Sequence, residues 1–274
     1  MIKVENVSFR YNKEEVLKDI NLEIKNGECI CIVGNNGSGK STLAKLIAGV
    51  IIPSKGKIFI DEINTSDKKS YEDLRKKIGI VFQNPENQII FSNVYADIAF
   101  GIHNLKLDDE KNRIETSLGK VGMKDYIKES TYELSMGQKQ RVTIAGALAM
   151  STQILVLDEA TAMLDTRGKE DIYRVINNLK EAGYTVIYTT NISDEIFMAD
   201  RVIILNNKTI SAEIEKEKLI EKIDTLKALD IRLPKLLQII EELSKRGIDI
   251  NLNEFTIQEL ADQISGEIKK WKNL

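Results

Sequence analysis

Residues 28–42 read ECICIVGNNGSGKST, an apolar run, a glycine-rich turn and a lysine followed by two hydroxyl residues. The apolar run predicts a buried strand from Glu28 to Val33. After the turn, apolar spacing predicts a helix over Lys40–Ala48 that ends at Gly49, because glycine accepts the left-handed backbone common at helix ends. A strand, a glycine-rich turn and a helix in this order predict a parallel α/β domain.

The turn satisfies the P-loop pattern in the context that this pattern requires. In such a loop, backbone N–H groups converge on phosphate oxygens at the positive end of a helix. Lys40 adds a point charge there, and the Ser41 hydroxyl can ligate magnesium. An ordinary glycine-rich turn is the alternative, which the flanking strand and helix disfavour. The expected ATP-binding set is Gly34, Asn35, Asn36, Gly37, Ser38, Gly39, Lys40, Ser41 and Thr42.

Further short apolar runs, rich in β-branched residues, predict more strands of the same mixed, mainly parallel sheet. They lie at 78–82, 154–157, 185–189 and 202–205. The stretch from about Asn84 to Met150 lacks strand patterns and predicts a helical insertion. Residues before the P-loop predict a small sheet, with alternating apolar positions at Val7, Phe9, Tyr11, Leu17, Ile20, Leu22 and Ile24.

Composition disfavours several classes of protein. A net charge of −3, with acidic and basic residues interspersed, provides no basic face for nucleic acid. Cys29 and Cys31 share one face of a predicted core strand, which indicates buried thiols in a reducing compartment. No apolar stretch approaches the roughly 18 residues of a spanning helix, and the first residues lack a signal pattern. If the protein serves a membrane, we expect it to do so from the cytoplasm.

A second chemical motif ends the apolar run Ile154–Leu157, which is followed by Asp158 and Glu159. Two carboxylates at the mouth of a buried strand, in a chain with a P-loop, suit ATP hydrolysis. Asp158 would hold magnesium through its water shell, and Glu159 would polarise the attacking water. Strand ends often carry solvated charges, so this motif gains its weight from the P-loop.

Between these motifs lies Leu134-Ser135-Met136-Gly137-Gln138-Lys139-Gln140-Arg141, which resembles the signature of ATP-binding cassette (ABC) proteins. Met136 stands where the family usually has glycine. The resemblance implies that Ser135, Gly137 and Gln138 bind nucleotide held by the opposite subunit, so that a chain with one cassette must pair. On local pattern alone, Ser135 is simply a helix cap.

Other positions match the family one by one. Gln83 resembles the Q-loop glutamine, which senses magnesium and the γ-phosphate, so it is expected as a metal ligand and a catalytic residue. Tyr11 resembles the aromatic residue that stacks on adenine, although a plain sheet residue fits its spacing almost as well. Asp165 resembles the aspartate of the D-loop, which crosses the dimer interface. The resemblance covers residues 1–211 as a cassette, with the helical subdomain at about 84–150.

One position departs from the family pattern. Asn191 stands where a histidine is expected to contact the γ-phosphate. An amide donates a hydrogen bond but carries no positive charge and exchanges no proton. We therefore expect Asn191 as a catalytic residue of a subunit that hydrolyses ATP slowly. The one histidine, His103, lies in the helical region and is expected to be a surface or packing residue.

After about residue 211 the sequence predicts a helical domain over 212–274. Pro234 opens a helix that ends at Gly247, and Thr256 with Glu259 predicts a capping box. The apolar residues of these helices either pack on one another or form a dimer contact, which we expect from this domain. They are Leu236, Leu237, Ile239, Ile240, Leu243, Ile257, Leu260, Ala261, Ile264, Ile268 and Trp271.

Three segments resemble one branch, the ATPases of energy-coupling factor (ECF) transporters, which take up vitamins and metal ions. They are Phe82–Gln88 with Ala99–Gly101, Glu159–Asp165, and the tail from Leu229 to Leu260. The resemblance implies a peripheral protein on the cytoplasmic face of the cell membrane. It also implies three kinds of partner: a second ABC ATPase, alike or different, a transmembrane scaffold and a small substrate-binding membrane protein. Ile89, Ile90, Phe91, Val94, Tyr95 and Ile98 either line the groove for the scaffold or belong to the subdomain core.

Other kinds of cassette protein share part of this pattern. A DNA-repair cassette ATPase needs a long coiled coil between its P-loop and its signature, and the spacing from Lys40 to Ser135 leaves no room for one. A ribosomal cassette protein usually has two cassettes. A catalytically weakened partner in an asymmetric dimer, or a soluble cassette ATPase not tied to transport, stays open, and so does export. The transported substrate is not encoded in this subunit.

Overall fold

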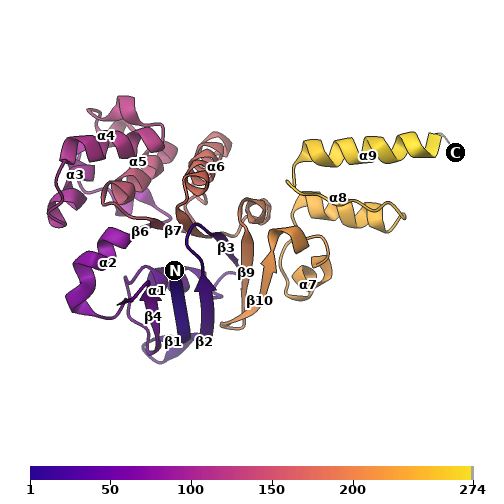
Figure 1. The fold of residues 1–274 in the computed structure, drawn as a ribbon, viewed down its shortest axis with the longest axis horizontal. Helices are drawn as coiled ribbons and strands as arrows, with labels where there is room; N and C mark the ends of the chain where they lie inside the picture. The colour runs from indigo at the N-terminus through magenta and orange to yellow at the C-terminus, as the bar shows by residue number, and fades with distance from the viewer. Residues whose placement is uncertain (273–274) are drawn as a thin grey trace.

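The fold is described from a computed structural model covering residues 1–272, with side chains described through residue 266. The smaller of two sheets is antiparallel and has the strand order β2-β1-β4-β5 (Figure 1). Its strands are β1 (Ile2–Tyr11), β2 (Glu14–Ile24), β4 (Lys55–Ile60) and β5 (Ile63–Asn64). The sequence pattern predicted only the first two, because β4 begins with the exposed polar run Lys55-Gly56-Lys57.

The larger sheet has six strands in the order β10-β9-β3-β8-β7-β6. All neighbouring pairs are parallel except β9 with β10, which confirms the predicted mixed, mainly parallel sheet. The strands predicted from apolar runs are all present, shifted by at most one residue at either end. The bounds are β3 (Cys29–Val33), β6 (Ile78–Val81), β7 (Ile154–Asp158), β8 (Thr185–Thr189), β9 (Arg201–Asn206) and β10 (Thr209–Glu215).

Six helices belong to this part of the molecule: α1 (Lys40–Ile47), α2 (Tyr71–Lys77), α3 (Val94–Asn104), α4 (Glu110–Lys120), α5 (Met136–Ala149) and α6 (Thr166–Glu181). Helices α3, α4 and α5 pack together away from the antiparallel sheet (Figure 1). Between Asn84 and Met150 the described backbone holds only one isolated bridge, Asn93 with Ser130, so the predicted helical insertion is confirmed. Short 3-10 turns lie at Lys68–Ser70, Pro85–Asn87, Lys124–Tyr126, Thr131–Glu133, Ser193–Met198 and Lys216–Lys218.

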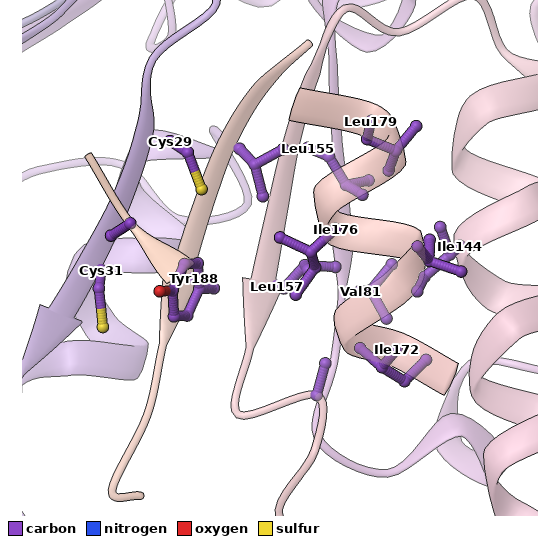
Figure 2. Packing of buried hydrophobic residues seen from close by; sticks show 14 of the residues in the cluster. Cys29, Cys31, Val81, Ile144, Leu155, Leu157, Ile172, Ile176, Leu179 and Tyr188 are labelled. Atoms are coloured by element: carbon purple, nitrogen blue, oxygen red, sulfur yellow. The ribbon is translucent and has the colours of Figure 1, made fainter. Parts of the chain in front are cut away.

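Strand β3 is buried on both faces and separates two apolar clusters. Ile30 and Ile32 pack toward α1 and the antiparallel sheet, whereas Cys29 and Cys31 face the opposite way. Figure 2 shows both thiols near Tyr188, on the side of the sheet where α6 packs over β7. Both cysteines are free and fully buried, as predicted, and burial raises the pKa of the Cys29 thiol to about 12. This alternation holds the strand, and therefore the loop that follows it, rigidly between two cores.

The chain continues past the sheet into α7 (Ile223–Ala228), α8 (Lys235–Ser244) and α9 (Ile257–Lys272), which lie beyond β10 (Figure 1). The predicted boundary at 211 falls inside β10, whose exposed Ser211, Glu213 and Glu215 made this edge strand look like charged helix. Gly247 follows α8 with a positive φ of 79°, as expected for a helix end.

The apolar residues of this tail divide into two groups. Leu236, Leu237, Ile240 and Leu260 are buried, so the stripe packs within the chain as one of the two alternatives predicted. Ile239 and Ile257 are 47% and 82% exposed and do not pack there. The side chains of Ile268 and Trp271 lie outside the described residues.

The predicted capping box at α9 is half formed. Thr256 Oγ1 accepts the Glu259 N–H at 3.1 Å. The Glu259 carboxylate reaches the backbone N–H groups of Asn253, Glu254 and Phe255 instead of that of Thr256. Through residue 272, no helix is both long and apolar enough to cross a bilayer.

Candidate nucleotide-binding and catalytic site

The P-loop joins β3 to α1 in a conformation that only glycine tolerates at its first position. Gly34 has φ +155°, and a Cβ there would lie 2.2 Å from the carbonyl oxygen of Leu205. Gly39, with φ +101°, precedes the first turn of α1 and packs against Leu17 of β2. The Ser38 hydroxyl is buried without a hydrogen-bond partner in the protein. An unpaired buried hydroxyl at a helix N-terminus fits a loop made to receive a phosphate group.

Lys40 spans this loop. Its ammonium donates to the carbonyl oxygens of Gly34 at 2.8 Å and Asn35 at 3.2 Å, and the residue is only 4% exposed. Burial lowers the pKa of Lys40, while the nearby Glu159 and Asp158 carboxylates act in the opposite direction. Thr42, in the same turn of α1, is buried, and Ser41 is partly exposed.

The two acidic residues stand at the end of β7, next to β8. Asp158 is 5% exposed and its Oδ1 accepts the Thr189 hydroxyl at 2.8 Å, while Thr189 Oγ1 accepts the Glu159 N–H at 3.0 Å. Glu159 has a left-handed backbone, with φ 49°, which is unfavourable for a residue other than glycine. Its carboxylate is therefore aimed by the backbone turn.

Two amide side chains hold that carboxylate from opposite sides. Asn191 Nδ2 donates to Glu159 Oε1 at 2.8 Å, and Gln83 Nε2 donates to Oε2 at 3.3 Å. Gln83 and Asn191 are both exposed, and Glu159 is partly exposed. The predicted residues Gln83, Glu159 and Asn191, which come from three distant segments, thus meet in one cluster.

Sheet topology explains this convergence. The P-loop follows β3, Glu159 follows β7, Asn191 follows β8 and Gln83 follows β6 by two residues. Because these strands are parallel neighbours, their carboxyl ends lie along one edge of the sheet, where ligands bind in open α/β folds. A hollow of about 270 Å³ on this edge is lined by Gly34, Asn35, Asn36, Asn191 and the segment 230–232.

The signature residues line a different hollow. Ser135 caps α5, with its Oγ accepting the Gln138 N–H at 3.3 Å while Gln138 Oε1 accepts the Ser135 N–H at 2.8 Å. Ser135 therefore caps α5, and its contact with nucleotide held by an opposite subunit stays a prediction. Gly137 lies beside Gly168, and Asp165 caps α6 by accepting the Gly168 N–H at 2.7 Å. These residues share a hollow of about 710 Å³, separate from the one at the P-loop.

Tyr11 and His103 lie elsewhere. Tyr11 ends β1, is 46% exposed and packs edge-on against Phe9 at a centroid distance of 4.7 Å. Stacking on adenine stays a prediction for it. His103, near the end of α3, is exposed and pairs with Glu110 of α4, so it is the surface residue predicted.

Sequence reasoning missed three residues that shape the site. Thr189 bonds Asp158, and its place at the end of β8 opposite Asp158 could have been a signal. Gln88 and Gln140 hold the backbone of Phe82: its N–H donates to Gln88 Oε1 at 3.2 Å, and Gln140 Nε2 donates to its carbonyl at 3.0 Å. They fix the residue before Gln83, and no local pattern reveals this.

Comparisons with known proteins agree with this geometry. A family model described as ABC transporter matches residues 17–162. The chain belongs to the ABC transporter family. Within this ABC family it groups with ECF transporter ATP-binding proteins. EcfA1 of Caldanaerobacter subterraneus subsp. tengcongensis is 41% identical over 96% of this chain and 98% of its own length. EcfA2 of the same organism is 40% identical over 100% of this chain and 99% of its own length.

Solved structures of other ABC proteins lead to the same assignment. The cbiO1 protein from Clostridium perfringens, part of the ABC transporter complex cbiONQ, has a TM-score of 0.74 at 35% identity, over 88% of this chain and 98% of that one. The dimeric bacterial ABC transporter cassette MJ0796 has a TM-score of 0.71 at 31% identity, over 79% and 99%. The predicted cassette fold and the ABC ATPase class are confirmed.

A third hollow, of about 550 Å³, lies between α2, α3 and α5 of this ABC subunit. Two of the residues predicted for the scaffold groove line it. Ile90, 65% exposed, and Ile98 line it together with Tyr71 and Arg75. Phe91 packs on Phe100, which lines the hollow, with ring centroids 5.5 Å apart. Val94 is fully buried, and Tyr95 bonds Glu110 at 2.6 Å, so these two belong to the subdomain rather than to the groove.

Proposed function

We propose that this chain is the ATP-hydrolysing subunit of an ECF importer that takes up vitamins or metal ions. The observation that carries the proposal is the Glu159 carboxylate, held by the Gln83 and Asn191 amides at the same sheet edge as the P-loop. A carboxylate aimed in this way is suited to accept a proton from the attacking water.

The P-loop supplies the binding half of this site. Backbone N–H groups at the start of α1 and the Lys40 ammonium would hold the β- and γ-phosphates, and the unpaired Ser38 hydroxyl would gain a partner. Tyr11 would stack on the adenine. The Gly34 and Gly39 conformations keep side chains out of the phosphate path.

Magnesium fits the donor set of this site. The Ser41 hydroxyl, the Asp158 carboxylate and the Gln83 amide are hard oxygen donors, the type that magnesium prefers. No cluster of three or more His, Cys, Asp or Glu side chains occurs in the described part of the chain that could form a closed metal cage. An ion shared between a few protein oxygens and the phosphates agrees with that composition. When bound, it would neutralise charge that develops on the phosphate oxygens.

Pairing follows from the separation of the two hollows. The P-loop faces one and Ser135, Gly137 and Gln138 face the other, so one chain offers two half-sites. A second cassette chain, identical or different, would complete each of them, with Asp165 at the interface. The exposed Ile239 and Ile257 suit the additional dimer contact expected from the domain at 212–274.

The third hollow supports a partner in the membrane. Exposed Tyr71, Ile90 and Phe100 line a depression that also holds the charged Glu72, Arg75 and Asp97. A short amphipathic helix from a transmembrane scaffold fits such a surface. The scaffold would also carry the small substrate-binding membrane protein, and this subunit would act from the cytoplasmic face.

Slow hydrolysis is the second part of the proposal, and Asn191 favours it. Its amide holds Glu159 in place but supplies neither positive charge nor a transferable proton. A different partner ATPase would then provide the faster site.

The experiment is to tag the chain in its own cells, solubilise the membranes gently and identify what co-purifies by mass spectrometry. A helical membrane scaffold, a second cassette ATPase and small membrane proteins are expected. With the partner's own site inactivated, phosphate release by this complex should stop in Glu159→Gln. Recovery of soluble proteins alone would refute the importer, and unchanged phosphate release in Glu159→Gln would refute the catalytic assignment.

A further inference from the structure

A buried carboxylate lies behind the catalytic cluster. Glu195 belongs to the 3-10 turn Ser193–Met198, four residues after Asn191, and is 3% exposed. Its Oε1 accepts two hydroxyl groups, from Thr161 at 2.6 Å and from Tyr173 at 2.8 Å. Its backbone carbonyl accepts the hydroxyl of Tyr188 at 2.7 Å. Both partners of the carboxylate are neutral side chains from other parts of the fold.

The two hydroxyl donors occupy different positions relative to the site. Thr161 is two residues after Glu159 and four before Asp165, in the loop between β7 and α6. Tyr173 lies in the middle of α6, whose helical hydrogen bonds already fix it. The bond to Thr161 therefore holds a loop, whereas the bond to Tyr173 joins a regular helix.

This loop needs an external anchor. Glu159 has a φ of 49°, and the chain then turns tightly, with the Ala162 N–H donating to the Glu159 carbonyl at 3.0 Å and the Leu164 N–H to the Thr161 carbonyl at 3.2 Å. An unfavourable backbone conformation persists only when surrounding contacts enforce it. Thr161 is 5% exposed, so water cannot replace its bond to Glu195.

Burying a carboxylate is costly compared with an apolar side chain of the same size, so packing alone does not explain Glu195. A charged acceptor does make short, directional bonds to hydroxyl donors. In this position it ties the loop after β7 to the turn after β8. Those two segments carry Glu159 and Asn191, whose side chains meet at 2.8 Å.

We propose that Glu195 is a positioning residue: through Thr161 it sets the loop 159–165 and so aims the Glu159 carboxylate at the γ-phosphate end of the nucleotide. This inference rests on the proposed role of Glu159 as the base. It adds a residue that touches neither nucleotide nor metal.

The test removes, one at a time, the two hydroxyl groups that donate to Glu195 Oε1, with substitutions of nearly the same shape. Thr161→Val removes the loop bond, Thr161→Ser retains it, and Tyr173→Phe removes only the helix bond. Hydrogen exchange of the full chain, followed by mass spectrometry, reports on the amides of 159–165 without any need for activity. We expect exchange there to be about tenfold faster in Thr161→Val and unchanged in Thr161→Ser and Tyr173→Phe.

Phosphate release by the complex, measured with the partner's own site inactivated, provides the second readout. Thr161→Val should lower kcat by about tenfold, because small misplacement of a reacting group is costly, while ATP affinity stays within twofold. Unchanged exchange and turnover in Thr161→Val, or equal effects in Tyr173→Phe, would overturn the anchor. Glu159→Gln separates the two proposals: if it keeps wild-type turnover the base assignment falls, and if it is inactive while Thr161→Val behaves like Tyr173→Phe only the anchor falls.

Discussion

Replacing Asn191 by alanine and by histidine should move ATP turnover in opposite directions. Alanine removes the amide donor, whose nitrogen lies 2.8 Å from Glu159 Oε1, and leaves Gln83 as the other amide donor in this cluster, at 3.3 Å. Histidine restores a donor and adds a group that can become positively charged. The expected order of turnover is histidine above asparagine above alanine.

The magnitude follows from the contact that is lost. A hydrogen bond to a charged group contributes about 1.5–3 kcal/mol. Asn191 is exposed, so water replaces part of the interaction and about 1–2 kcal/mol remains, which corresponds to a five- to thirtyfold slower reaction for Asn191→Ala. For Asn191→His, a gain of about tenfold is expected from general acid–base assistance, larger at pH 6 than at pH 8 because the imidazole is then charged.

The assay is phosphate release by the purified complex with the partner's own site inactivated, at saturating magnesium and ATP, with nucleotide affinity measured separately. Asn178→Ala, an exposed amide lost from the helix α6, is the matched control and should leave turnover unchanged. Wild-type turnover in Asn191→Ala would show that the amide does not support Glu159. Absence of any increase in Asn191→His would refute the explanation of slow hydrolysis.

Three further perturbations test the fold and the groove. Gly49→Ala should lower the free energy of unfolding by about 1–2 kcal/mol in a denaturant titration, because Gly49 has φ +64° and a Cβ would lie 2.7 Å from Leu74; an unchanged midpoint would contradict this. Cys29 should resist alkylation at pH 8 in the native chain and react after unfolding. Because its folded pKa is raised from 9.0 to about 12, it stabilises the fold fully below pH 9, and that contribution should be lost between pH 9 and 12 by about 1.4 kcal/mol per pH unit. Ile90→Asp should abolish co-purification with the membrane scaffold without changing the melting temperature, whereas Ile52→Asp, at 52% exposure outside the groove, should retain it; equal recovery would rule out the groove.

Elements with strong local patterns were predictable. The strand before the P-loop is apolar on both faces, which predicts burial on both faces. Cys29 and Ile30, which face opposite sides of the sheet, are both fully buried. Strand β10, at the edge of the larger sheet, was missed because its exposed positions are polar or charged. Strand β4 was missed because its first three residues, Lys55-Gly56-Lys57, are exposed. Edge position depends on neighbouring strands, which a local pattern does not contain.

The sequence by itself determined which chemical groups this protein has: the glycines and Lys40 of the P-loop, the Asp158–Glu159 pair, and an amide at Asn191 in place of a histidine. Backbone preference and side-chain chemistry are local properties, so they can be read from short motifs. Only the tertiary structure decided that Gln83 and Asn191 both bond Glu159, and that Thr161 bonds Glu195 across the loops. These contacts join residues far apart in the chain, and strand order and the direction of each buried side chain bring them within hydrogen-bonding distance.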